Sequence, residues 1–174
     1  MDKKEFLIQH LTGGKSYQEI SDEHQIAREQ LSNWWNEGEE IRNEIKRSNQ
    51  LYNSRVGKPE FSKFEELGKR EFYQWFADQP KVCGYCGIEE FKLQKLFDKE
   101  SGPLKTKRGR GRTLELERRD SASNEYSPEN CLLACYVCNN HKSDLISEEE
   151  HLRYFAPAIK KYLDDKFLNL NDLG

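Results

Sequence analysis

Two cysteine pairs with the same spacing constrain the fold of this 174-residue chain more than any other feature. Cys83 and Cys86 form the first pair, and Cys135 and Cys138 form the second. A two-residue spacer lets both sulfurs of a pair face one ion, and four thiolates suit the closed tetrahedral site of a structural Zn²⁺. We therefore predict one structural zinc ion bound by these four residues. Cys131 has no partner at this spacing and is expected to be a buried core thiol.

The composition is consistent with a fold that relies on a metal. Hydrophobic residues make up 35% of the chain and charged residues 34%, which predicts a lean apolar core. The five cysteines are an odd number, and no secretory signal pattern precedes them, which argues against a secreted disulfide scaffold. No apolar run approaches the ~20 residues that a membrane helix requires. We expect a cytoplasmic protein that does not enter a membrane.

The segment between the cysteine pairs predicts a β-hairpin followed by a short helix. Leu114 and Leu116 alternate with charged neighbours in a strand expected at 113–118, the period-two pattern of a half-buried strand. Ser127 and Pro128 mark the turn into a second strand at 130–134, and a helix begins after Cys135. Two strands and one helix do not bury a stable core alone, so the zinc site is expected to hold them.

The order of these motifs resembles the HNH (ββα-metal) nuclease family, and within it the type II restriction enzymes. The resemblance covers roughly residues 60–150 and rests on CGYCGI at 83–88, ERRD at 117–120, YSPEN at 126–130 and LACYVCNNHKS at 133–143. It implies a mostly helical α+β protein with a zinc-stapled ββα-metal domain. It also implies a metal-dependent endonuclease that hydrolyses phosphodiester bonds of double-stranded DNA.

The resemblance also implies roles for individual residues. Glu117 falls on the position of the acidic metal ligand, Asn130 on the structural loop asparagine, and Asn139 on the ligand that opens the helix. Glu117 and Asn139 would bind one catalytic divalent ion, Mg²⁺ or Mn²⁺, with DNA phosphate and water completing its shell. Arg118 stands where the family usually has its histidine base, and arginine stays protonated. We expect Arg118 to stabilise charge on the phosphate.

A different residue must then accept the proton from water. By resemblance, Tyr85 in the first cysteine pair is the expected catalytic base, and Tyr126 and His141 are the alternatives. A second interpretation is a zinc-containing DNA-binding protein that has lost catalysis, and Arg118 is its main support. The joint presence of Glu117, Asn130 and Asn139 favours the enzyme. A homing-type HNH nuclease is the alternative enzymatic role.

Charge is distributed unevenly along the chain. The net charge is −3, but residues 105–119 contain seven basic and two acidic residues, a local net of +5 that leaves −8 for the rest. Such a segment attracts phosphate while the remaining surface repels it. We predict a DNA-binding loop whose basic residues are Lys105, Lys107, Arg108, Arg110 and Arg112.

The N-terminal region predicts a helix-turn-helix of the homeodomain or resolvase type. Helices are expected at 3–11, from Ser16 with Glu19 completing a capping box, and from Ala27, with a turn near Gln25. The alternative is three helices that serve only for packing or dimerisation. The residues that could reach base edges or phosphates are Arg28, Gln30, Ser32 and Asn33.

Two domains follow from these patterns: a helix-turn-helix region at 1–52 and a zinc-bound HNH domain at 59–168, joined by a linker at 53–58. Further helices are expected at 39–52, at 62–78 with a Ser62–Glu65 capping box, within 88–104, and after Ser147, with a kink near Pro157 and a tail at 169–174. A single ββα-metal site cuts one strand, so double-strand cleavage implies a homodimer on a palindromic site.

Overall fold

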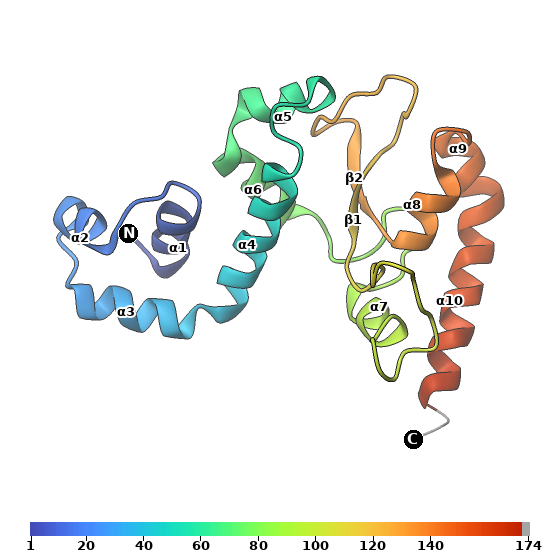
Figure 1. Ribbon diagram of the computed structural model, residues 1–174, viewed down its shortest axis with the longest axis horizontal. Helices are drawn as coiled ribbons and strands as arrows, with labels where there is room; N and C mark the ends of the chain where they lie inside the picture. The colour runs from blue at the N-terminus through green and yellow to red at the C-terminus, as the bar shows by residue number, and fades with distance from the viewer. Residues whose placement is uncertain (172–174) are drawn as a thin grey trace. The chain divides into compact units, whose positions relative to one another are not determined.

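The computed structural model describes residues 1–171, and its contacts divide the chain into two units, Met1–Asp78 and Gln79–Gly174. Figure 1 shows that helices dominate both units and that one small sheet lies in the second. The expected α+β, mostly helical class is confirmed. No helix within the described residues is long and apolar enough to cross a membrane.

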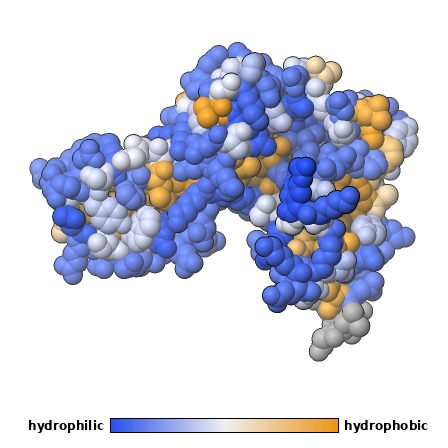
Figure 2. Space-filling view, viewed as in Figure 1, coloured by the Kyte–Doolittle hydropathy of each residue, from blue (hydrophilic) through white to orange (hydrophobic). Residues whose placement is uncertain are grey.

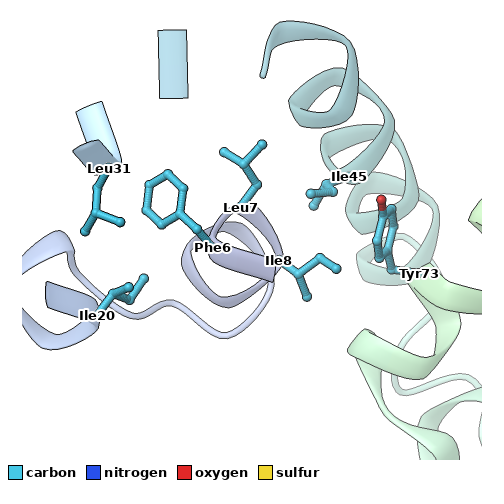
Figure 3. Packing of buried hydrophobic residues seen from close by; sticks show 7 residues of the cluster. All are labelled: Phe6, Leu7, Ile8, Ile20, Leu31, Ile45 and Tyr73. Carbon is cyan, nitrogen blue, oxygen red and sulfur yellow. The ribbon is translucent and has the colours of Figure 1, made fainter. Parts of the chain in front are cut away.

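Unit 1 (Met1–Asp78) is helical. Its elements are α1 (Lys3–Leu11), α2 (Tyr17–His24), α3 (Arg28–Glu37), α4 (Glu39–Asn53), the 3₁₀ helix η1 (Pro59–Phe61), α5 (Ser62–Leu67) and α6 (Lys69–Asp78). Helices α1, α2, α3, α4 and α6 contribute to one hydrophobic cluster around α1. Figure 3 shows Phe6 directed toward Ile20 and Leu31, whereas Ile8 lies on the side of Ile45 and Tyr73.

Local capping explains where the first helices begin and end. Asp2 accepts a hydrogen bond from the Glu5 backbone N–H, and Ser16 and Glu19 form the predicted capping box. Gln25 ends α2 in the left-handed region with φ 53°, a conformation that an L-residue adopts at some cost. The helical elements expected at the N-terminus are therefore present. Their role as a DNA-reading unit stays a prediction.

The region after α4 differs from the expectation. Ser62 is the first residue of α5 and caps nothing, and the helix expected at 62–78 breaks at Gly68, whose φ is +95°. In addition, α6 lies in unit 1 because Tyr73 belongs to its hydrophobic cluster and Arg70 pairs with Glu5 of α1. The structural boundary at Asp78 thus differs from the linker expected at 53–58.

Unit 2 (Gln79–Gly174) contains the hairpin. Its elements are α7 (Glu90–Leu96), β1 (Glu115–Arg118), β2 (Cys131–Ala134), α8 (Tyr136–Lys142), α9 (Glu148–Glu150), the π-helical segment η2 (His151–Phe155) and α10 (Ala156–Asn171). The strands are antiparallel, with Glu115 opposite Ala134 and Arg118 opposite Cys131. The predicted strand–loop–strand–helix order is confirmed.

Several ends in unit 2 also differ from the expectation. The helix expected within 88–104 is shorter, because α7 ends at Leu96 and a turn follows. Ser147 and Glu150 form the predicted capping box, and the kink expected near Pro157 is replaced by the π-helical turns of η2 just before it. Helix α10 continues to Asn171, so 169–171 is not a tail, and 172–174 lie outside the described residues.

The surface agrees with the lean core. Figure 2 shows hydrophilic residues over most of the visible face, with apolar residues in small separate areas. Buried polar groups are unevenly distributed: Ser48 in unit 1, and in unit 2 the residues Glu90, Glu117, Ser127, Lys142 and His151. Buried charges need partners, so the environment of the unit 2 residues decides what this unit can do.

Candidate metal centre and functional site

Four buried cysteines come together at one end of the hairpin. The sulfurs of Cys83, Cys86, Cys135 and Cys138 lie within 4.8 Å of one another, and none is in a disulfide. The loop of the first pair is attached to β2 because the Gly84 N–H donates to the Leu133 carbonyl at 2.8 Å. The predicted grouping of the two pairs is confirmed.

The sulfur positions fit a tetrahedral zinc ion. A Zn–S bond of about 2.3 Å places two tetrahedral sulfurs about 3.8 Å apart, and the Cys86 and Cys135 sulfurs are separated by 3.8 Å. The Cys135 backbone N–H donates to the Cys83 sulfur at 3.2 Å, as a thiolate ligand requires. Hydrogen bonds with the neighbouring cysteine side chains, of which Cys135 has the largest effect, lower the pKa of the Cys83 thiol. Cys131 is buried outside this group, as predicted.

The two glutamates of β1 lie on the strand face that meets α8. Glu115 and Glu117 are two residues apart, so their side chains project to the same side of the strand. Each bonds to a different residue of α8. Asn139 Nδ2 donates to Glu115 Oε2 at 2.8 Å, and Lys142 Nζ donates to Glu117 Oε1 at 3.3 Å. Asn139 and Lys142 are three residues apart and therefore share one face of the helix.

Glu117 is paired with a lysine that is fully buried. The side chain of Lys142 is 0% exposed and that of Glu117 is 11% exposed. Lys142 also donates to the Arg118 carbonyl and to Ser121 Oγ, both at 3.0 Å. Burial raises the pKa of Glu117, while the positive charge of Lys142 opposes that shift. The lysine thus holds the start of the hairpin loop as well as the carboxylate.

The sequence interpretation assigned no role to Glu115 or Lys142. Lys142 lies four residues after Cys138, and this position was the only feature of the sequence that pointed to a role for Lys142. Glu115 belongs to the same alternation as Glu117, so its place on the shared strand face could be inferred. Its bond to Asn139 could not. The structure places Glu117 and Asn139 on facing elements, without a direct bond between them.

Arg118 lies beside Tyr126 in the hairpin loop. Its guanidinium carbon is 4.9 Å from the centroid of the Tyr126 ring, and its Nη1 donates to the Asn124 side-chain oxygen. Both Arg118 and Tyr126 are half-buried. A cation and a phenol are therefore adjacent at the end of β1.

Tyr85, the expected base, lies in a different environment. Only 7% of it is exposed, and its hydroxyl is 3.5 Å from the Arg118 carbonyl. Burial and then the Glu117 carboxylate raise its pKa. His141 is exposed on the side of α8 that faces η2, where its ring is 4.5 Å from that of Phe155.

Asn130 organises the hairpin loop. Its Nδ2 donates to the Asp120 carbonyl at 3.0 Å, to Ser123 Oγ at 3.0 Å and to the Glu125 carbonyl at 2.7 Å. Its Oδ1 accepts from the Asp120 N–H at 2.8 Å. These contacts are what a structural loop asparagine requires.

Several residues of the basic loop bond to other residues of unit 2. Lys105 donates to the carbonyls of Asp98 and Lys99, Arg112 pairs with Asp98, and Arg110 pairs with Glu115. The exposed Lys107 and Arg108 have no hydrogen-bond or ion-pair partner among residues 1–171. On α3, the candidates Arg28, Gln30, Ser32 and Asn33 are all exposed. The side chains predicted to contact DNA are accessible on α3 and, in the loop, at its tip.

Comparison with protein-family models gives no match, and no curated protein matches the chain. Among solved structures, the rare-cutting HNH restriction endonuclease PacI is similar, with 27% sequence identity and a TM-score of 0.47. The similarity covers 68% of this chain and 78% of that chain.

Proposed function

We propose that this protein is a metal-dependent HNH endonuclease that hydrolyses phosphodiester bonds of double-stranded DNA, acting as a sequence-specific type II restriction enzyme. One observation carries the proposal. The hairpin and α8 present a buried carboxylate, Glu117, and a half-buried amide, Asn139, on facing elements beside the cysteine quartet. Carboxylate and amide oxygens suit a hard divalent cation.

The proposed chemistry divides among few residues. Glu117 and Asn139 would bind Mg²⁺ or Mn²⁺, which would stabilise charge on the scissile phosphate and the leaving oxygen. Arg118 would donate to the phosphate, and Asn130 would keep the loop in place. The four cysteines would hold the structural zinc and take no part in the reaction.

Geometry favours Tyr126 over Tyr85 as the proton acceptor. Tyr126 is half-buried, so part of it is accessible, and its ring lies beside the Arg118 guanidinium that is proposed to contact the phosphate. The Tyr85 hydroxyl is buried against a backbone carbonyl, where water and DNA have little access. Both residues stay candidates, and removal of one hydroxyl at a time separates them.

Loss of the proposed cation ligands tests the metal site. Glu117→Ala and Asn139→Ala should abolish cleavage while leaving DNA binding in place, because each removes a cation ligand. Glu117→Ala also leaves the buried Lys142 without its carboxylate partner, so zinc content and circular dichroism would be measured for each variant. Glu129→Ala and Asn140→Ala are matched controls, since both residues are exposed neighbours of the same chemical type. Cleavage of a random-sequence DNA pool with Mg²⁺ or Mn²⁺ would be measured. Full activity of Glu117→Ala would contradict the metal-site assignment.

The two tyrosines give a direct comparison. Replacement of the base by phenylalanine should slow cleavage by about 10²–10⁴-fold, the usual contribution of a positioned base. We expect this loss in Tyr126→Phe and near-normal rates in Tyr85→Phe. Arg118→Ala should slow cleavage without moving its pH profile, since arginine transfers no proton. A catalytically inactive wild type that still binds DNA would support the DNA-binding protein instead.

DNA contacts are proposed for both units. Substitution of Lys107 and Arg108 by glutamine should weaken binding to all sequences and reduce the salt slope by about one unit per lost contact. Lys161→Gln, an exposed change on α10, serves as the control. Gln30→Ala and Asn33→Ala should weaken only the specific site, by about 1–3 kcal/mol per lost base contact. Equal effects on all sequences would make α3 a phosphate-binding element.

A homodimer on a palindromic site is proposed for double-strand cutting, because one ββα-metal site cuts one strand. Sedimentation of the protein on a palindromic duplex should give two chains per duplex. One chain per duplex, with single-strand nicks as the product, would contradict the dimer.

A further inference from the structure

We propose that Glu115 is a positioning residue that orients the Asn139 amide for cation binding, with Arg110 as its counter-ion. This inference rests on the proposed function, since it concerns the same metal site. It adds two residues that neither the motif order nor the expected ligand set includes. It also connects the basic loop to the orientation of one cation ligand.

The contacts around Glu115 are dense. Arg110 donates to Glu115 through Nε to Oε1 at 3.0 Å and through Nη2 to Oε2 at 2.6 Å. Asn139 Nδ2 donates to the same Oε2 at 2.8 Å. The side chain of Glu115 is only 16% exposed. The guanidinium carbon of Arg110 also lies 5.1 Å from the Tyr136 ring centroid, on the first turn of α8.

The chemistry of these groups fixes which end of the amide faces Glu115. Arg110 occupies both Glu115 oxygens as a donor, so the carboxylate is an acceptor at both. Asn139 must therefore present its NH₂ group to Glu115, and its Oδ1 lies on the other side of the planar amide. Without Glu115, the broad rotation about the terminal torsion would let either end face the cation. An NH₂ group directed at a cation repels it.

The same contacts explain why Glu115 is not itself the proposed ligand. Its two oxygens accept three side-chain hydrogen bonds, which leaves it fewer lone pairs for a cation than Glu117 has. Glu117 accepts from one side chain, Lys142, through Oε1, and no side chain among residues 1–171 donates to its other oxygen. Asn139 likewise retains Oδ1. The strand thus carries two carboxylates of which one binds and one orients.

Arg110 has a defined place in this arrangement. Although it belongs to the basic segment, its guanidinium is held by Glu115, and that hydrogen bond raises the pKa of Arg110. Removal of the Arg110 side chain would leave the Glu115 carboxylate, next to the proposed cation site, without its counter-ion. Arg110→Ala should therefore change cation binding in addition to any change in DNA binding, whereas Arg108→Ala should change only DNA binding.

The test measures cation binding without DNA. Mn²⁺ would be titrated into the zinc-loaded full chain and the free ion followed by electron paramagnetic resonance. Glu115→Ala should weaken Mn²⁺ binding by about 10–100-fold, the usual effect of removing a residue that orients a metal ligand. Glu115→Gln keeps an acceptor for Asn139 and should restore binding to within a few-fold of wild type. Glu129→Gln, in the same hairpin, is the control.

A second measurement does not depend on the cation. In the metal-free site, the ¹⁵N-resolved side-chain amide protons of Asn139 should show one hydrogen-bonded proton in wild type and Glu115→Gln, and none in Glu115→Ala. If Glu115→Ala fails to fold, as its zinc content and circular dichroism would show, the wild-type and Glu115→Gln amide spectra still decide. A wild-type Asn139 amide without a hydrogen-bonded proton overturns the inference.

The possible failures are distinguishable. A wild-type protein that binds no Mn²⁺, or an Asn139→Ala variant that binds it normally, overturns the proposed metal site and the role of Glu115 with it. The positioning role alone is overturned if Asn139→Ala loses Mn²⁺ binding as expected but Glu115→Ala binds Mn²⁺ within twofold of wild type. A Glu115→Gln variant as weak as Glu115→Ala shows that the charge matters rather than the acceptor, which also overturns it.

Discussion

The two units are stabilised by different means. Unit 1 buries an apolar cluster of seven residues contributed by α1, α2, α3, α4 and α6, and Ser48 is its only buried polar residue. Unit 2 has one two-stranded sheet and buries Glu90, Glu117, Lys142 and His151 among its apolar residues and cysteines. Buried polar and charged groups cost free energy unless they are paired. Unit 2 therefore depends more on its metal centre.

The comparison shows where function is placed. In unit 1, the residues of α3 proposed to contact DNA are exposed and lie outside the apolar cluster. In unit 2, the groups proposed to take part in cleavage are themselves buried or half-buried. We expect a metal ion bound by the cysteine quartet to offset the cost of burying those groups.

Removal of zinc should separate the units most clearly. Cys138→Ser, or a strong chelator, should unfold unit 2 and leave the helices of unit 1 protected, because structural zinc contributes about 10 kcal/mol or more to small sites. Hydrogen exchange followed by mass spectrometry would measure each unit. Cys131→Ser is the control and should keep its zinc. Loss of protection in both units together would contradict independent stabilisation.

Truncation of the unit 1 core should have the converse effect. Phe6 is fully buried at the centre of the cluster, and Phe6→Ala should destabilise unit 1 by about 3–5 kcal/mol. Zinc content should not change. Val56→Ala, at a residue that is 46% exposed, should cost less than about 0.5 kcal/mol. Denaturant unfolding with a zinc assay would test this, and zinc release by Phe6→Ala would show that the units are coupled.

Two glycines allow a matched comparison of strain and space. Gly111 (φ +109°) has no room for a side chain, since a Cβ would lie 2.6 Å from the Phe97 ring, whereas a Cβ at Gly57 (φ +82°) would meet nothing within 4 Å. Gly57→Ala should therefore cost only the backbone strain, about 1–2 kcal/mol. Gly111→Ala should add overpacking of about 1–3 kcal/mol. Equal costs in thermal unfolding would show that the loop moves freely away from Phe97.

The Glu5–Arg70 pair of unit 1 should contribute least. Arg70 donates to both oxygens of Glu5 at 2.9 and 2.8 Å, and this hydrogen bonding lowers the pKa of Glu5. The contribution is present above the unfolded pKa of the carboxyl and is lost as pH falls through its lower folded value. A double-mutant cycle of Glu5→Gln and Arg70→Gln should give about 0.2–1 kcal/mol at neutral pH, as for exposed pairs. An unchanged coupling at pH 2 would contradict the assignment.

Short-range features of the fold were predictable. The Ser16–Glu19 and Ser147–Glu150 capping boxes form as expected, since the partners are three residues apart. The interruption at Gly68 was not predicted, because the aromatic residues on both sides of it follow a helical period. The capping box expected at Ser62 also favoured one continuous helix. The assignment of α6 to unit 1 also depends on contacts distant in sequence. Patterns within about one turn of helix were predictable, and contacts across the chain were not.

Local sequence patterns were enough to predict the four cysteines that could hold a metal ion and the order of the hairpin elements. Two CxxC spacings restrict four sulfurs to one ion, and Asn130 has loop donors and acceptors within ten residues. Only the tertiary structure decided that Glu115 meets Asn139, that Lys142 is buried against Glu117, and that Arg118 lies beside Tyr126. The physical reason is that these contacts depend on which face of β1 packs on α8 and on the path of the loop, and no local spacing fixes either.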